Sequence, residues 1–229
     1  MARDVVIGYC YGDHVTTPFH HSLLRTFIHD LCTRGRIANF LPVYATVNIG
    51  GPRNEVVRQF LATDAEWLWM LDTDAAFSHD LLHKLLDMAD RDEYPIMGAL
   101  AYRLKSTGED GPTGFPVREF VPVAYQQIKD EEGNWVGYRE LVVHSGDGLL
   151  EVDATGCHCL LVHRDVFTKM DAPGPYPWFR ETILASGISA GEDITFCLAA
   201  RDAGYPVYLD TRLIAGHAKM MIGTDEGAQ

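Results

Sequence analysis

The stretch WLWMLDTD, residues 67–74, places two aspartates one residue apart at the end of a short apolar run. A continuous apolar run of this length indicates a buried β-strand. Open α/β sheets bind ligands beyond the carboxyl ends of their strands, and alternate residues of an extended chain point the same way. We therefore expect Asp72 and Asp74 to converge on one cation. Carboxylate oxygens suit Mg²⁺ or Mn²⁺, which also bind phosphates, so the stretch predicts a metal-dependent enzyme with a phosphorylated substrate.

Strand and helix patterns alternate around this stretch. We expect strands at residues 5–10, 40–46, 67–71 and 96–101, and helices that begin near Thr17, Asn54 and Ser78. Such alternation predicts an α/β fold, a Rossmann-like and mainly parallel sheet that is flanked by helices.

The first helix carries clear boundary signals. Thr17 is a favourable N-cap, Pro18 fits the first helical position, and Gly35 marks the end. Apolar residues recur at helical spacing and are expected on its buried side: Phe19, Leu23, Phe27 and Leu31. The next helices are expected to bury residues 56, 57, 60 and 61 and residues 81, 82, 85 and 86.

The pattern changes after residue 103. Residues 104–150 are rich in glycine, proline and charge, and strand-like pieces at 120–125 and 135–143 flank a turn at 129–134. We interpret them as a small antiparallel insertion, with residues 103–119 either a lid or a connector. A strand near 157–163, a helix over 194–203 and a strand over 207–209 follow. Residues 1–229 are expected to form one domain, with a nucleotide-binding half (about 1–103) and an acceptor half (about 104–217).

Composition narrows the functional classes. The chain has 229 residues and a formal net charge of −13, which argues against a general nucleic-acid binder. Its apolar runs are far shorter than the ~20 residues of a membrane span, and no apolar leader segment opens the chain. We expect a soluble, cytoplasmic protein. Cys157 and Cys159 flank His158, where a zinc site or reduced, partly buried thiols are the alternatives.

Two later segments add candidate chemistry. Glu192 and Asp193 follow Gly191 and open the helix, where acids are also favourable simply because they complement the helix dipole. His217 follows Gly216 just beyond the last strand, and a lone histidine of this kind is often structural. Neither segment indicates an enzyme by itself.

Taken in order, the Asp72-x-Asp74, Gly191-Glu192-Asp193 and Gly216-His217 motifs resemble those of glycosyltransferases with the GT-A fold, family 2 in particular. The resemblance covers most of residues 3–217 and is strongest at 53–77, 152–156 and 178–217. It implies transfer of a sugar from a nucleotide-diphosphate sugar, with a UDP-sugar as the expected donor, to an acceptor hydroxyl.

The resemblance also implies ligands for a divalent cation, Mn²⁺ or Mg²⁺. Asp74 would bind the ion directly, and Asp72 would bind the ion directly or through water, or else the ribose hydroxyls of the donor. His217 would add a nitrogen ligand, which Mn²⁺ accepts more readily than Mg²⁺. The ion would stabilise the charge that develops on the departing diphosphate.

In inverting members of the family, the aspartate that matches Asp193 removes the proton of the acceptor hydroxyl. Glu192 would then contact the donor sugar or the acceptor. In a retaining enzyme both acids would instead bind sugar hydroxyls, and relatives of both kinds are known to share the Gly-His ligand. We favour inversion because residues 191–193 resemble the base-bearing motif.

Four further residues are assigned to substrate binding by the resemblance. Tyr9 would stack on the nucleotide base, Arg53 would contact the nucleotide or its phosphates, Gly156 would permit close approach of the donor sugar, and Trp178 would line the acceptor site. The alternatives are core packing for the two aromatic residues, a surface position for Arg53 and a plain turn at Gly156.

Other functional classes remain open. A haloacid-dehalogenase-like phosphatase also carries a DxD sequence, but on its first strand, whereas Asp72 follows the third expected strand. A sugar- or metal-binding module without catalysis is the second alternative. The expected partners are a nucleotide sugar and a soluble acceptor, a protein or a small glycoside, without a membrane or strong nucleic-acid binding.

Overall fold

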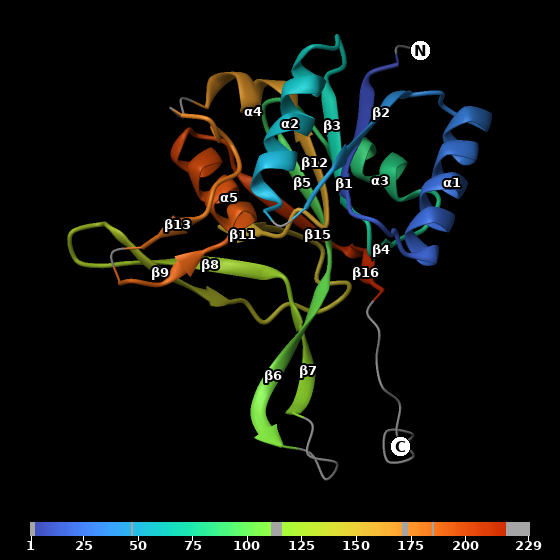
Figure 1. Ribbon diagram of the computed structural model, residues 1–229. Helices are drawn as coiled ribbons and strands as arrows, with labels where there is room; N and C mark the ends of the chain where they lie inside the picture. Colours follow the sequence, from blue (N-terminus) through green and yellow to red (C-terminus); the bar gives the residue numbers. More distant parts are fainter. Residues whose placement is uncertain (1–2, 47, 111–115, 171–173, 185, 219–229) are drawn as a thin grey trace.

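The computed structural model describes residues 3–218 except 47, 111–115, 171–173 and 185, and its centre is a seven-stranded sheet (Figure 1). The strands follow the order β10-β15-β5-β12-β3-β1-β2. Their bounds are β1 Val5–Tyr11, β2 Ile37–Tyr44, β3 Trp67–Asp72, β5 Ile96–Leu100, β10 Leu149–Val152, β12 Cys159–His163 and β15 Val207–Ile214.

The sheet is mostly parallel, as the sequence predicts. β1 runs parallel to both β2 and β3, and β15 runs parallel to β5. β12 lies antiparallel between β3 and β5, and β10 is antiparallel to β15 at one edge. The strand predicted near 157–163 therefore returns to the middle of the sheet, against the direction of its neighbours.

Helices cover both faces of the sheet (Figure 1). They are α1 Thr17–Cys32, α2 Gly50–Leu61, α3 Leu81–Met88, α4 Arg164–Lys169 and α5 Glu192–Asp202. One apolar cluster joins the sheet to α2, α4 and α5, and a second joins it to α1 and α3. The fold is a mixed α/β architecture with small antiparallel additions.

The apolar run of β3 contributes side chains to both apolar clusters. Leu68 and Met70 pack toward α2, whereas Trp67, Trp69 and Leu71 pack on the opposite face. Because alternate side chains of a strand point to opposite faces, a strand that is covered on both sides must be apolar at every position. The run ends where the sheet ends, so Asp72 emerges at the carboxyl edge.

The α2 helix lies unusually close to β1. A Cβ atom added at Gly8 would overlap the Val56 side chain. A side chain at this position of β1 would therefore push α2 away from the sheet. The lack of a side chain at Gly8 therefore determines how close α2, which carries Arg53 and Asn54, lies to the sheet.

The first helix differs from the prediction in two respects. Its N-cap is Thr16 instead of Thr17, because the Thr16 hydroxyl accepts the Phe19 N–H at 3.3 Å. Its inward residues are Phe19, Ser22, Thr26 and Asp30, whereas Phe27 and Leu31 are exposed and Leu23 is half-buried. A strict four-residue spacing drifts by ~40° per step around an α-helix, so the predicted stripe leaves the core within three steps.

The insertion is larger and more regular than expected. Within the segment 103–119, predicted as a lid or connector, residues 103–110 and 116–119 lie in β6 Tyr102–Asp110 and β7 Pro116–Pro122, two antiparallel strands that project from the body in Figure 1. β8 Ala124–Lys129 and β9 Trp135–Glu140 form a hairpin around the predicted turn, and β11 Ala154–Thr155 joins them. The predicted piece at 120–125 thus spans the boundary between two strands.

The remaining elements are short. β4 Ala75–Ala76 pairs with β16 Gly216–His217, and β13 Thr182–Ile183 pairs with β14 Ser189–Ala190. Ser78, the predicted N-cap of α3, lies before the actual N-cap Asp80, which makes no capping hydrogen bond through its side chain. The four predicted core leucines of α3 are buried.

Candidate metal centre and active site

The two aspartates of the DxD motif meet two histidines at the carboxyl edge of the sheet. Asp72 ends β3, and Asp74 precedes β4, whose Ala75 pairs with His217 of β16. His158 comes just before β12, next to β3, and its carbonyl accepts the Asp72 N–H at 3.2 Å. One ligand atom from each of Asp72, Asp74, His158 and His217 lies within 4.8 Å of the others.

The His158 ring is oriented by a backbone carbonyl. Its Nε2 lies 3.0 Å from the Gly216 oxygen, and because a carbonyl only accepts, Nε2 carries the hydrogen. In the neutral ring this leaves a lone pair on Nδ1, which lies 3.7 Å from one oxygen of Asp72 and one of Asp74. That nitrogen is buried and has no hydrogen-bond partner among the described residues.

The His217 ring follows the same design. Its Nδ1 lies 2.6 Å from the Tyr102 carbonyl and so carries the hydrogen, while Nε2 lies 3.9 Å from an oxygen of Asp74. Backbone carbonyls that fix the tautomer of an imidazole are the usual support of metal-binding histidines.

These four side chains fit a divalent cation. Two carboxylates and a buried imidazole nitrogen that lacks a hydrogen-bond partner among the described residues converge, an arrangement that a cation would stabilise. Two nitrogen and two oxygen donors suit Mn²⁺ or another transition ion better than Mg²⁺, which favours an all-oxygen shell. The predicted ligands Asp72, Asp74 and His217 are therefore brought together, and His158 is the one that the sequence did not reveal.

Arg53 connects the DxD motif to the start of α5. It is buried, and its guanidinium donates to Asp72 at 2.7 Å and to Glu192. The surface position considered for Arg53 is therefore wrong, and both ends of its fork are already engaged. Burial pushes the pKa of Asp72 upward, but the charge of Arg53 and its hydrogen bond to Asp72 lower it, and the pKa lies well below its ordinary value.

Asn54 performs the complementary task on the other side of α2. Its side-chain NH₂ donates to the carbonyls of Gly50 and Phe179, both at 2.7 Å. Its oxygen accepts from the backbone N–H groups of Trp178 and Phe179 at 3.0 and 3.3 Å. A buried amide with all these bonds clamps the 178–179 segment to α2, a role that the sequence did not indicate.

Asp193 lies in the first turn of α5, beside Glu192. Burial raises the pKa of Asp193 to about 6; Arg53 opposes the increase and Glu192 adds to it. One carboxylate oxygen accepts the Ile194 N–H at 2.8 Å. A Cβ added at Gly156 would lie 3.4 Å from the other oxygen, so the predicted glycine borders the Asp193 carboxylate.

The two predicted aromatic contacts have packing partners. The Tyr9 ring meets Phe19 edge-on with centroids 5.3 Å apart. The Trp178 indole donates to the Phe167 carbonyl at 2.9 Å and packs against the Phe167 ring at 6.1 Å. Both rings contribute to the apolar clusters on the sheet, which favours core packing as their main role.

The cysteine pair does not belong to the ligand cluster. Cys159 is buried, and its sulfur accepts the Trp69 indole N–H at 3.3 Å. Burial raises the pKa of Cys159 to about 12, and the pKa of Cys157 also lies well above its ordinary value, chiefly through burial. Both thiols are buried, and neither belongs to the Asp/His cluster among the described residues, which favours the packing interpretation.

Comparisons with known proteins support the fold. No protein-family model matches the sequence, and no curated protein matches it significantly. Among solved structures, A197 from STIV aligns with a TM-score of 0.55 and 17% identity over 96% of this chain and 86% of that one. The structure of GalNAc-T7 with UDP, GalNAc and Mn²⁺ aligns with a TM-score of 0.55 and 10% identity over 93% of this chain and 43% of that one. The chain thus spans less than half the length of the GalNAc-T7 structure.

None of the helices that the structure describes has the length and apolar content required to cross a bilayer. The chain has a GT-A-like fold, with an Asp/His cluster that fits a metal ion at the carboxyl edge of its sheet.

Proposed function

We propose that the protein is a metal-dependent glycosyltransferase that moves a sugar from a nucleotide-diphosphate sugar to an acceptor hydroxyl. The observation that carries the proposal is the convergence of Asp72, Asp74, His158 and His217 at the carboxyl edge of a GT-A-like sheet. The GalNAc-T7 neighbour was solved with UDP, GalNAc and Mn²⁺, which supports a UDP-sugar donor and manganese.

The four ligands would hold the ion, which supplies charge stabilisation for the departing diphosphate. Arg53 keeps Asp72 ionised and in place through a direct ion pair. The Arg53 guanidinium also forms an ion pair with Glu192, so the same side chain orders the start of α5. We assign Arg53 to the donor side of the site on this basis, and Glu192 to contact with the donor or the acceptor.

Asp193 is the proposed general base of an inverting reaction. With its pKa raised to about 6, it is ionised at neutral pH and still basic enough to accept the proton of the attacking hydroxyl. Gly156 borders the carboxylate, and a Cβ there would lie 3.4 Å from one of its oxygens. The acceptor would be a soluble protein or small glycoside in the cytoplasm.

Ligand-dependent thermal unfolding tests this function. UDP, GDP and their sugars, each with and without Mn²⁺, would be added to the wild-type protein and to Asp74→Ala. Because a ligand that binds only the native state raises the midpoint, one nucleotide should raise it only with metal, and Asp74→Ala should abolish the shift. Release of that nucleotide diphosphate in the presence of acceptor glycosides would then report turnover.

Absence of any metal-dependent shift would contradict the transferase. Release of inorganic phosphate from a sugar phosphate would support the phosphatase class instead. That alternative is disfavoured because Asp72, the nucleophile in such an enzyme, is held in an ion pair by Arg53.

A further inference from the structure

Helix α1 leaves an apolar stripe at the surface, in which Phe27 packs edge-on against Phe40 of β2. Leu24, Phe27, Ile28 and Leu31 are 37–60% exposed, and their spacing of three and four residues places them on one stripe. The opposite, inward side is formed by Phe19, Ser22, Thr26 and Asp30. Helices of globular proteins normally do the reverse, and exposed apolar stripes of this kind mark interaction sites.

The inverted orientation has a structural cause. The Asp30 carboxylate accepts the backbone N–H groups of Arg36 and Ile37 at 3.1 and 2.9 Å, and it lies 2.8 Å from Nε2 of His83. These contacts anchor the buried acid at the start of β2 and on α3. The helix cannot roll its apolar stripe inward without breaking all three.

The exposed surface of α1 carries a fixed positive charge, Arg25, and no exposed acidic side chain, in a protein whose net charge is −13. Asp30 is the only acidic residue of α1, and it is buried. Arg25, His20 and His21 are exposed, and His29 is half-buried. The stripe therefore complements a partner that is anionic at its surface and apolar beneath it.

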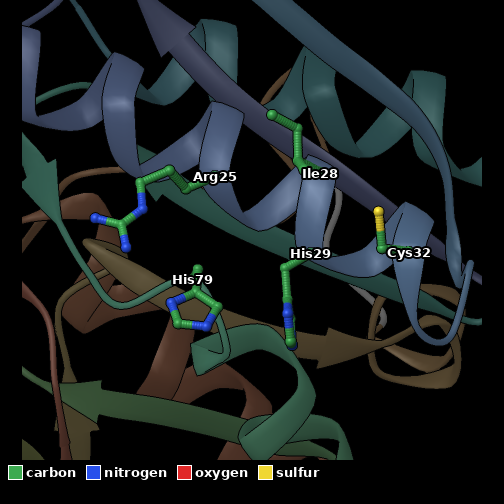
Figure 2. A pocket seen from close by; sticks show the side chains of 5 residues that line it. All are labelled: Arg25, Ile28, His29, Cys32 and His79. Carbon is green, nitrogen blue, oxygen red and sulfur yellow. The ribbon is translucent and has the colours of Figure 1, made fainter.

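A hollow of about 340 Å³ lies beside the stripe and is lined by Arg25, Ile28, His29, Cys32 and His79. Figure 2 shows the Arg25 guanidinium and the rings of His29 and His79 on the same side of α1. The two imidazole rings are 4.7 Å apart between centroids. Guanidinium and imidazole N–H groups are suitable donors for a phosphate.

We propose that α1 docks on an anionic lipid surface, with Leu24, Phe27, Ile28 and Leu31 entering the interface and Arg25, His29 and His79 binding lipid phosphates. Helices with an apolar stripe and basic flanks lie in the plane of a membrane interface without spanning it. The exposed part of the stripe is roughly 400 Å², about half of what each partner buries in a stable protein–protein interface. A bilayer requires no such area and no matching shape. This docking is independent of the proposed transfer reaction.

Vesicle co-sedimentation tests the proposal with the full chain. Phosphatidylcholine vesicles with and without phosphatidylglycerol would be mixed with wild type, Leu24→Asn/Leu31→Asn, Arg25→Gln and the control Val142→Asn, whose side chain is 86% exposed elsewhere. We expect binding to the anionic vesicles that weakens with salt. The double variant should bind at least about tenfold more weakly, Arg25→Gln about fivefold more weakly, and the control unchanged.

Three results would overturn the proposal. They are no binding of wild type to anionic vesicles, equal binding to neutral and anionic vesicles, and unchanged binding of both α1 variants. A wild-type dimer that becomes a monomer in Leu24→Asn/Leu31→Asn, without vesicle binding, would assign the stripe to self-association instead. Unchanged circular dichroism and thermal midpoints of the variants would exclude misfolding as the cause of weaker binding.

Discussion

The charge of Arg53 acts on both Asp72 at the end of β3 and Asp193 at the start of α5, yet the pKa values of the two aspartates move in opposite directions. Asp72 bonds directly to the guanidinium, and that contact outweighs its burial. Asp193 feels the same charge without an ion pair and lies beside Glu192, so burial dominates and raises its pKa to about 6. The Arg53 guanidinium therefore favours the ionised form of Asp72, the proposed metal ligand, whereas Asp193, the proposed base, keeps a raised pKa.

We expect the largest effect from removal of the Asp193 carboxylate. Asp193→Asn should lower kcat by ~10²–10⁴-fold because no other group takes the acceptor proton, while the nucleotide-dependent thermal shift should persist. Asp202→Asn, at the exposed end of the same helix, is the matched control. Retention of turnover in Asp193→Asn would favour a retaining reaction over an inverting one.

Replacing Arg53 should disturb Asp72 and Glu192 together, because both carboxylates pair with its guanidinium. Arg53→Met leaves Asp72 and Glu192 without their buried partner, which we expect to lower the free energy of unfolding by about 3–5 kcal/mol in denaturant titrations. Arg58→Met, in the same helix but with exposed contacts, should change it by less than about 1 kcal/mol. Similar losses in the two variants would show that the network contributes little to stability.

A third prediction tests whether His158 binds the metal ion together with Asp72. His158→Gln removes one imidazole nitrogen, so the Mn²⁺ concentration that half-saturates the thermal shift should rise by ~10–100-fold, as it does for other metal-site substitutions. His144→Gln, an exposed substitution, should leave it unchanged. A value unchanged in His158→Gln would remove His158 from the ligand set, and EDTA should abolish the shift in every variant that binds metal.

Local patterns predict much of this molecule, but not its long-range pairings. β3, α3 and the alternation of strands and helices follow from apolar periodicity and are confirmed. The association of Asp72, Asp74 and His217 was predicted from the motif order. His158 escaped prediction because its place depends on β12 entering the sheet beside β3 in the antiparallel sense, and nothing in the local sequence indicates that pairing.

The errors in α1 and in the insertion have a similar origin. The polar inward face of α1 is stabilised by Asp30 contacts with residues that follow the helix, so the apolar spacing alone misled the prediction. β6 and β7 carry charged, mostly exposed side chains and stabilise each other by pairing instead of by burial. Periodicity therefore identifies elements that the core supports and fails where polar contacts determine the geometry.

The smallest expected effect is on how the free energy of unfolding depends on pH, and it arises from the raised pKa of Asp193. A folded-state pKa above the ordinary 3.8 means that Asp193 prefers its neutral form in the native protein, so its contribution to stability falls as the pH rises from about 4 to about 6. Asp193→Asn, which stays neutral, should therefore be more stable than wild type by about 1–3 kcal/mol at pH 7. Below pH 4 the two proteins should unfold at the same denaturant concentration.

Denaturant midpoints measured across this pH range, with Asp202→Asn as the control, would show whether the difference opens between pH 4 and 6. The kcat/KM of wild type should rise through the same interval, because the base works only when it has lost its proton. If Asp193→Asn is inactive yet no more stable than wild type at pH 7, the folded protein does not disfavour the ionised form of Asp193. The asymmetry between the two aspartates would then come from the Arg53–Asp72 pair alone, and the raised pKa could not be what prepares Asp193 as a base.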